Sequence, residues 1–419
     1  MAFNICSKNN KFNIGAGSVQ KTLPLTKNTG STWIYCNYPE YIPTDGLGDK
    51  NKGAHYLNQV IVGTGTHNIF YSHFNAMQIP VDTASETVIQ HKASGAKYYG
   101  IQIWNPYSTT ATIQVKKRGH HNCVGDPNDA SVLPFVAAAG VPVREYFNST
   151  AENAISLAPN TGTWICDESI PEYTTESAWM STAFSGMIEF STSAPVKVIV
   201  YAYNTKYMID GNATAYPPAT SYPDYERLVE LGATPNKMYS GYADYDGYET
   251  NGTIELTATE IMNGSVYFVT NHNQNASSTS NFKINGVNKK SDSIPITLFN
   301  EDTTVSDESN DNLGNWGTVY KIKLKLTNDT STARTFYGYV RCDASGYDQF
   351  PAIKTSNGFE YAKINTNDAN SWRWLEQSVP AYGSVEDTYY FVLGTNSTHR
   401  LKHIFSVKYW DADLSPEEV

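Results

Sequence analysis

The sequence lacks the short motifs that mark the common enzyme classes, and it is poor in charge. It contains no G-x-S-x-G nucleophile elbow, no G-x-G-x-x-G or P-loop pattern and no H-E-x-x-H pair. Charged residues make up only 17% of the chain, against about 25% in average globular proteins. We therefore expect a protein that is not an enzyme and that holds no cofactor.

Cysteine is scarce and long apolar runs are absent. The five cysteines stand far apart and form no C-x-x-C pair, so they indicate neither a disulfide framework nor a zinc site. Buried free thiols are the expected state for most of them. No run of 18 apolar residues occurs, and the first residues show no signal-peptide core. The sequence therefore predicts no membrane insertion and no visible signal peptide.

Positive charge is also scarce. The net charge is -11 and the sequence pI is about 5.3, whereas binding to nucleic acid requires clustered Lys and Arg. The only compact basic run, Lys116 to Arg118, stands at the end of a predicted strand, where cations discourage strand addition. Nucleic acid is therefore not an expected partner.

The chain is rich in the residues that favour strands and turns. Tyr reaches 30 residues, and Tyr and Thr suit a pleated surface while Asn, Gly and Ser suit reversals. The clearest unit is Tyr99 to Val115, which has two alternating strands around an Asn105-Pro106 turn. The predicted fold class is all-β, with two tandem antiparallel β-sandwich domains of immunoglobulin-like or jelly-roll-like style.

Four blocks recur in the second half of the chain in the same order, which predicts an internal duplication. The hairpin at 99–115 aligns with 320–336, so that Asn105 corresponds to Asn328. The other three pairs are 69–76 with 267–276, 162–171 with 371–380, and 184–203 with 390–409. The alternative is that any two antiparallel sandwiches share aromatic strands and Asn turns.

The predicted domains are residues 1–204 and 251–410, joined by a Tyr/Pro/Gly-rich linker at 205–250 and followed by an acidic tail at 411–419. Inside the linker, Pro223 to Gly232 has the early proline, acidic first turn and terminal glycine of a short helix. For the apolar stretch from Val132 to Phe147, a short helix and a buried connector both remain open.

Tyrosines of the predicted linker are the candidate binding residues, because Tyr combines a flat apolar ring with a polar hydroxyl. They are open to three interpretations: packing at the domain junction, a subunit contact and a glycan platform. The interface or glycan candidates are Tyr222, Tyr225, Tyr239, Tyr242, Tyr245 and Tyr248.

Candidates for metal binding are weaker. Asp244, Asp246 and Glu249 form an oxygen-rich turn without the full twelve-residue calcium pattern. His120 and His121 are adjacent on a predicted strand and therefore point to opposite faces. His73 and His272 end equivalent predicted strands, which indicates a structural hydrogen bond rather than catalysis.

Together these patterns predict a non-enzymatic structural subunit of a surface or extracellular assembly, such as a filament, a spore appendage or a virion component. The expected partner is a further copy of the chain, in a homo-oligomer or a polymer. The alternative is an adhesive module that binds surface glycans through exposed Tyr and Trp. The expected location is extracellular or on a particle surface.

Overall fold

The computed structural model describes an all-β chain. The described residues are 2–10, 19–37, 54–74, 78–83, 86–91, 98–124, 134–169, 182–203, 208–209, 212–213, 226–227, 240–262, 264–272, 282–298, 311–312, 314–342, 349–364, 371–394 and 400–408. They divide into two compact units that are discontinuous in sequence. Unit 1 comprises Met1–Thr29, Asp246–Ile294 and Asn312–Val419, and unit 2 comprises Gly30–Tyr245 and Pro295–Asp311.

Unit 2 contains two main sheets. Their strands are β3 (Leu23–Cys36), β4 (Ala54–Val62), β5 (Gly65–Phe74), β8 (Tyr98–Asn105), β9 (Ala111–Val124), β10 (Ile155–Leu157), β11 (Thr161–Ser169), β12 (Thr182–Thr192), β13 (Val196–Tyr203) and β16 (Glu226–Arg227). Of β3, the part from Gly30 on belongs to this unit. One sheet has the order β10-β9-β12-β5-β3, and the other has the order β11-β8-β13-β4-β16. Shorter strands are β6 (Gln78–Thr83), β7 (Glu86–His91), β14 (Met208–Ile209), β15 (Asn212–Ala213) and β23 (Thr297–Leu298).

One hydrophobic core joins these two sheets. Alternate residues of β8, such as Ile101 and Ile103, are fully buried together with Ile113 of β9 and Val198 of β13. The alternation that defines the strands in the sequence therefore delivers the apolar side chains of both sheets to the same layer, as in a β-sandwich.

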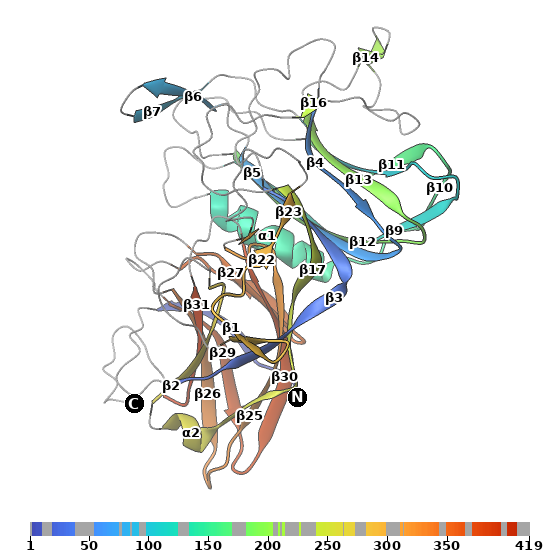
Figure 1. Cartoon of the computed structure of the whole chain (residues 1–419). Coiled ribbons are helices and arrows are strands. Elements are labelled where there is room, and N and C mark those ends of the chain that lie inside the picture. The colour runs from blue at the N-terminus through green and yellow to red at the C-terminus, as the bar shows by residue number, and fades with distance from the viewer. Residues whose placement is uncertain are drawn as a thin grey trace. The chain divides into compact units, whose positions relative to one another are not determined.

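Helix α1 (Pro134–Asn148) covers part of the sheet that contains β9, which decides the open question about this stretch in favour of a helix (Figure 1). The close approach requires Gly119 on β9. A Cβ atom at that position would lie 1.8 Å from the backbone oxygen of Pro142. Any side chain at Gly119 would push the helix off the sheet.

Unit 1 also contains two main sheets. Its strands and helix are β1 (Ile5–Asn10), β2 (Val19–Gln20), β17 (Ser240–Thr250), β18 (Ile254–Thr257), α2 (Ala258–Met262), β19 (Val266–Thr270), β20 (Phe282–Ile284), β21 (Val287–Lys289), β22 (Ile294–Pro295), β24 (Asp311–Asn312), β25 (Val319–Thr327), β26 (Arg334–Cys342), β27 (Pro351–Thr355), β28 (Gly358–Tyr361), β29 (Ser371–Val379), β30 (Ser384–Leu393) and β31 (Leu401–Ser406). Of β17, β22 and β24, only the residues from Asp246 on, Ile294 and Asn312 belong to unit 1. One sheet has the order β1-β29-β26-β31-β19-β2, and the other contains the run β17-β25-β30-β27-β28.

Aromatic rings fill the space between the sheets of unit 1. Trp374 of β29 and Tyr389 of β30 lie with their ring centroids 4.7 Å apart. His403 of β31 accepts or donates hydrogen bonds on both ring nitrogens, to Tyr389 at 3.2 Å and to Thr270 at 3.0 Å. Burial lowers the pKa of His403 to about 3, so this ring is neutral and acts as a polar core residue.

A buried asparagine locks two turns together in unit 2. The Nδ2 atom of Asn105 donates to the carbonyl oxygens of Thr109 at 2.8 Å, Leu157 at 3.1 Å and Ala158 at 3.2 Å. Its Oδ1 atom accepts from the backbone N–H of Tyr107 at 3.1 Å. One side chain therefore satisfies the ends of β8 and β10, where the strands leave carbonyl groups without ladder partners.

Unit 1 contains the same lock. The Nδ2 atom of Asn328 donates to the carbonyl oxygens of Thr332 at 2.8 Å, Val379 at 3.1 Å and Pro380 at 3.0 Å. Its Oδ1 atom accepts from the backbone N–H of Thr330 at 3.1 Å. The turn that each asparagine holds also contains a residue with positive φ at the same position, Asn160 at 54° and Tyr382 at 55°.

The strand order around these locks is also the same. The run β10-β9-β12-β5-β3 in unit 2 and the run β29-β26-β31-β19-β2 in unit 1 both show three antiparallel pairs followed by one parallel pair. This order matches the predicted alignments of 69–76 with 267–276 and of 99–115 with 320–336. The other two predicted alignments join strands that hold different places in these runs, since β29 holds the place of β10 rather than β11 and β31 holds the place of β12. The duplication itself remains a prediction.

The predicted all-β class is confirmed, whereas the helix in the linker is wrong where it can be assessed. Glu226–Arg227 is the strand β16, which pairs in parallel with β4, and the other residues of 223–232 lie outside the described part. Residues 240–250 of the predicted linker form β17. The domain ranges remain predictions, and the compact units differ from them because the first 29 residues belong with the C-terminal strands.

We predict that Asn105→Ala and Asn328→Ala each lower the free energy of unfolding by roughly 1–3 kcal/mol, because a buried carbonyl group, of Leu157 or of Val379, loses its side-chain donor and two half-buried carbonyl groups lose one of theirs. Chemical denaturation of each variant measures this loss. The variants Asn105→Asp and Asn328→Asp keep the acceptor but remove the donor, so they should be nearly as unstable. Asn288→Ala, on the exposed strand β21, is the control, and an equal loss in that variant would contradict the prediction.

Candidate functional site

The predicted tyrosine cluster is not a surface cluster in the described residues. Tyr245 and Tyr248 are only 5% and 1% exposed, and Tyr242 is half-buried. The hydroxyl of Tyr248 donates to the backbone oxygen of Asp292 at 2.7 Å. The prediction is therefore wrong for Tyr245 and Tyr248 as exposed contact residues, whereas Tyr222, Tyr225 and Tyr239 lie outside the described part.

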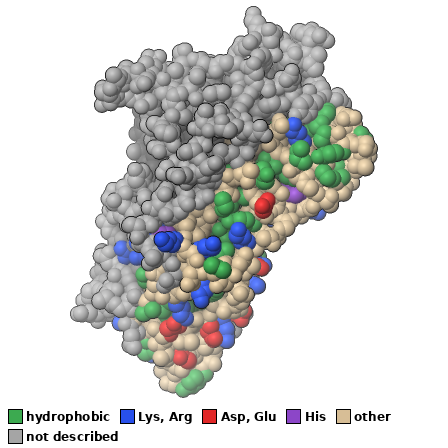
Figure 2. All heavy atoms as spheres, in the orientation of Figure 1, with side chains coloured by type: hydrophobic (Ala, Val, Ile, Leu, Met, Phe, Trp, Pro, Cys, Tyr) green, Lys and Arg blue, Asp and Glu red, His purple; other side chains and the backbone are tan. Residues whose placement is uncertain are grey.

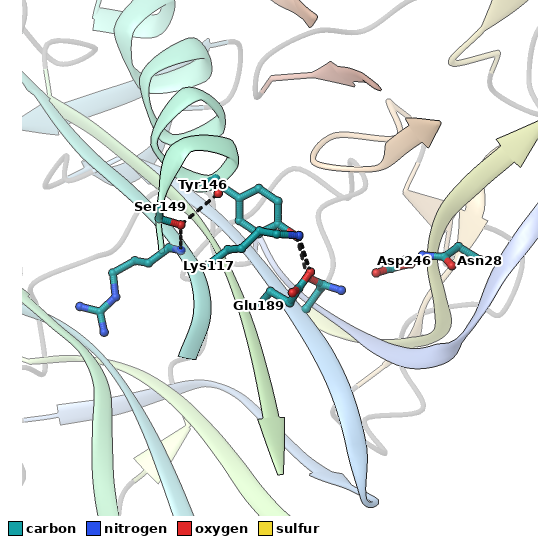
Figure 3. Close-up of polar contacts among 8 residues, drawn as sticks. Asn28, Lys117, Tyr146, Ser149, Glu189 and Asp246 are labelled. Carbon is teal, nitrogen blue, oxygen red and sulfur yellow. Dashed lines mark hydrogen bonds and ion pairs between the residues drawn. The ribbon is translucent and has the colours of Figure 1, made fainter. Parts of the chain in front are cut away.

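The predicted acidic turn is part of the strand β17, and its carboxylates have other partners. Asp246 accepts a hydrogen bond from Asn28 at 2.6 Å (Figure 3), and Glu249 forms an ion pair with Lys321 at 3.2 Å. Asp244 is exposed. Because Asp246 and Glu249 are three residues apart in a strand, they point to opposite faces and cannot share one ion. Within the described ranges, no group of three or more His, Cys, Asp and Glu side chains is placed to hold a metal.

The most buried charged group is Asp292 in unit 1, with no exposed surface. Its carboxylate accepts three hydrogen bonds, from the backbone N–H of Asn271 at 2.8 Å, the backbone N–H of His272 at 2.7 Å and the hydroxyl of Tyr320 at 2.7 Å. Burial raises the pKa of Asp292 to about 6, and these donors oppose the rise. His272 thus contributes a backbone group, and the carboxylate holds the end of β19 to β25.

The backbone of Asp292 is held as well. Its carbonyl oxygen accepts from the Nδ2 atom of Asn315 at 2.6 Å and from the hydroxyl of Tyr248. Asn315 also donates from Nδ2 to Tyr320 at 2.7 Å and accepts from the N–H of Ile294 at 3.0 Å. The cluster joins four separate chain segments without an exposed reactive group, which suits a structural role.

A second chain of polar contacts, buried at Tyr71 and half-buried at His120 and Asn122, lies in unit 2. The hydroxyl of Tyr71 is 2.6 Å from Nδ1 of His120, and Nε2 of His120 is 2.9 Å from Oδ1 of Asn122. Asn122 donates from Nδ2 to the carbonyl oxygen of Ser169 at 2.7 Å, so its Oδ1 atom must accept from His120. Burial lowers the pKa of His120, and the neutral ring then accepts from Tyr71. The chain of bonds connects β5, β9 and β11.

Two cysteine thiols near these residues are buried and form no disulfide. Cys36 and Cys166 are free cysteines, and burial raises the pKa of each thiol to about 12. Cys36 lies 3.6 Å from Nε2 of His73, which is the structural role expected for that histidine. A thiol with such a pKa stays protonated at neutral pH and is a poor nucleophile.

Helix α1 ends over a polar cluster that Figure 3 shows. Lys117 of β9 and Glu189 of β12 form an ion pair at 2.9 Å. The hydroxyl of Tyr146 lies 3.0 Å from Oδ1 of Asn68 and 3.2 Å from Oε2 of Glu189, and Lys117 sits 5.1 Å from the Tyr146 ring centroid. The cluster attaches the last turn of the helix to three neighbouring strands.

The surface of the described part carries both charge signs. On the face in Figure 2, acidic and basic side chains are interspersed. Three ion pairs link neighbouring elements of unit 1: Lys21 with Glu260, Lys321 with Glu249 and Lys325 with Glu255. The exposed members of such pairs contribute little stability, but they keep the outward faces of these strands polar.

The N-terminal strand β1 forms one edge of the six-stranded sheet of unit 1, where it pairs with β29. The pairing is antiparallel, with Ile5 opposite Leu375 and Asn10 opposite Ser371. Side chains of β29 also bind the strand, since Trp372 donates from Nε1 to Oγ of Ser7 at 3.0 Å and Gln377 accepts from the N–H of Asn4 at 2.9 Å.

Phe3 anchors this segment in the core. Its side chain has no exposed surface and packs edge-on against Trp374, with ring centroids 6.3 Å apart. Its N–H donates to Oδ2 of Asp387 at 2.9 Å, and its carbonyl oxygen accepts from Asn357 at 3.2 Å. The segment therefore closes one end of the sandwich with a single aromatic plug.

The local sequence pattern predicts a strand at this edge but not its pairing. The alternation of Phe3 and Ile5 with polar residues was the available signal, because it is the period of a half-buried strand. What it could not supply was the partner, which lies more than 360 residues away along the chain.

Comparison with known proteins does not assign the chain to a family. No family model matches the chain, and no curated protein matches it. The tandem CBM22-1 and CBM22-2 domains of Xyn10C from Paenibacillus barcinonensis share 9% identity, over 84% of this chain and 94% of that chain, with a TM-score of 0.13. The Broad Bean Stain Virus structure has the same identity and TM-score, over 84% and 88%. The VP2 subviral particle of infectious bursal disease virus shares 8% identity over 95% and 75%, with a TM-score of 0.12.

TM-scores this low carry no argument about function. In the part of the chain that the structure describes, neither helix is long and apolar enough to cross a membrane.

The raised pKa of Asp292 predicts a pH-dependent stability. The native carboxyl binds its proton more tightly than the unfolded one, whose ordinary pKa is 3.8. Its contribution is therefore complete below about pH 4 and is lost as the pH rises through about 6, a change of about 3 kcal/mol. Chemical denaturation from pH 4 to pH 7 should show this loss in the wild type but not in Asp292→Asn.

The same substitution at the exposed Asp244 removes one charge without touching the cluster, and this control should keep the wild-type pH dependence. Parallel curves for the wild type and Asp292→Asn would contradict the prediction.

Proposed function

We propose that the chain is a non-enzymatic structural subunit of a surface or extracellular assembly, such as a filament, a spore appendage or a virion component, and that it associates with further copies of itself. The observation that supports this proposal is that polar side chains inside the units bridge separate strands and turns. Asn105, Asn328, Asp292 and the Tyr71–His120 pair all hold strands and turns in place. A rigid frame of this kind suits a load-bearing subunit.

We infer further that the two units arose by internal duplication. The support is the repeated strand order together with the repeated Asn lock, in which four hydrogen bonds of Asn105 have counterparts at Asn328. Two copies of a robust module give a subunit more surface for contacts without a new fold.

Self-association predicts a concentration-dependent particle. Light scattering and electron microscopy of the purified chain should show a defined oligomer or an ordered polymer that grows with concentration. A particle with the mass of one chain at every concentration, together with native material that contains no ordered polymer, would overturn the proposal. Raised salt is a useful second condition, because it weakens surface ion pairs but strengthens apolar contacts.

A glycan-binding function is the second candidate, and one feature of unit 1 favours it. Lys354 of β27 stands between Phe359 of β28 and Tyr390 of β30 on one face of the sheet. Tyr361 lies on the same face, with its ring centroid 6.2 Å from that of Phe359. Half-buried aromatic rings beside a cation can stack on a sugar ring and bind its hydroxyl groups.

This candidate predicts that Tyr390→Ala weakens binding to a polysaccharide that the wild type retains on an affinity gel, by roughly tenfold for a lost stacking contact of about 1.4 kcal/mol. Tyr337→Ala, a half-buried tyrosine on the other sheet, is the matched control. A panel of polysaccharides that all fail to retain the wild type would count against the candidate.

A further inference from the structure

Lysines line the outward face of one sheet of unit 1. In β25 every second residue is buried, and three of the residues between them are the half-buried lysines Lys321, Lys323 and Lys325. Side chains two residues apart on one strand stand about 7 Å apart. The three ammonium groups therefore follow β25 as one column, in a chain whose net charge is -11.

The neighbouring strands add aromatic rings and a fourth lysine to this face. The pairing registers place four half-buried side chains level with one another on successive strands: Lys321 of β25, Tyr390 of β30, Lys354 of β27 and Phe359 of β28. Neighbouring strands are about 4.8 Å apart, so the two lysines of this row stand about 10 Å apart with a tyrosine between them. The two rings of the row are also about 10 Å apart.

The charges of these lysines are only partly compensated inside the unit. Lys321 forms an ion pair with Glu249 at 3.2 Å, and Lys325 forms one with Glu255 at 2.9 Å. Among the residues that the structure describes, no carboxylate forms an ion pair with Lys323 or Lys354. Two cations on opposite sides of β30 are therefore open to anionic groups of a ligand.

The tyrosine between the lysines indicates what kind of anion fits. A sugar ring stacks through its apolar face on an aromatic ring. A charged substituent of that sugar then lies at the rim of the ring, where the flexible stem of a lysine can bring its ammonium group to it. Tyr390 has a lysine on each side, and Phe359 offers a second ring further along the same row.

The composition of the face argues against two other occupants. Lysine and glutamate are depleted at the core of subunit interfaces, which disfavours a further copy of the chain. The carboxylates of Glu249, Glu255 and Glu386 stand next to the lysines of β25. They repel the phosphate groups of a nucleic acid, but they accept hydrogen bonds from sugar hydroxyl groups. A polymer that carries both negative groups and many hydroxyl donors fits this mixture.

We propose that the outward face of β25, β30, β27 and β28 binds an anionic polysaccharide, with sugar rings on Tyr390 and Phe359 and with carboxylate or sulfate groups on Lys323 and Lys354. This inference rests on the glycan-binding candidate and names its ligand class. The polymer crosses the strands, because the rings and lysines of the row lie on successive strands. Its affinity falls as salt rises, since the lysines are solvent-accessible point charges.

Affinity electrophoresis of the full chain tests this ligand class. The gels contain polygalacturonate or hyaluronan as carboxylated chains, chondroitin sulfate or dextran sulfate as sulfated chains, and dextran or methyl-esterified pectin as neutral chains. Polyglutamate is the polyanion without sugar, and single-stranded DNA is the nucleic acid. We expect retention by carboxylated or by sulfated chains, weakened by raised salt, and much weaker retention by the other probes. The chains that retain the protein identify the anionic group.

Variants of the face test the assigned contacts. Lys323→Ala and Lys354→Ala should each weaken the retention by roughly three- to fivefold, because each removes a cation that faces the ligand. Lys323→Arg keeps the charge and should bind nearly as the wild type does. Tyr390→Ala should weaken the retention while Tyr390→Phe keeps it, since the ring is retained. The matched control is Lys289→Ala, which removes the same charge at an exposed position of β21 and should change nothing.

The outcomes separate this inference from the candidate on which it rests. Retention by a neutral chain that Tyr390→Ala weakens and that both lysine variants leave unchanged overturns the anionic ligand, and the glycan-binding candidate stands. Equal retention by polyglutamate or by DNA also overturns the inference, because charge alone then accounts for binding. A wild type that no polysaccharide of the panel retains overturns both.

Discussion

In each unit the chain must pass from one sheet to the other without leaving backbone groups unpaired. The side-chain amides of Asn105 and Asn328 meet this constraint. A sandwich corner ends several strands at one place, and the carbonyl groups there have no ladder partner. One asparagine on each unit donates to three of these carbonyl groups and accepts from the following turn. The two turns are then fixed to each other, and the strands that leave them start in the register that buries their apolar faces.

The need to give each polar group that loses water a hydrogen-bond partner also explains two other polar clusters. Asp292 is held by two consecutive backbone N–H groups and a tyrosine hydroxyl, and the neutral His120 is held between Tyr71 and Asn122. Each group loses its hydration on burial and regains hydrogen bonds only in one arrangement of the neighbouring segments. Such groups specify a single structure more than they stabilise it. They are concentrated where irregular chain segments meet the sheets, where apolar packing alone would permit several arrangements.

Local patterns in the sequence were sufficient for the strands and for the Asn turns, because alternation and turn chemistry act over a few residues. The strand from Tyr99 and the strand from Tyr320 follow from this alternation, and so does the equivalence of Asn105 and Asn328. The pairing of strands that lie far apart in the sequence could not be predicted from such local patterns. The tyrosines of β17 are buried by the neighbouring strands, and nothing in their spacing distinguishes that face from a surface. The predicted alignment of 162–171 with 371–380 meets the same limit, since aromatic strands that end at proline resemble one another whichever sheet they join.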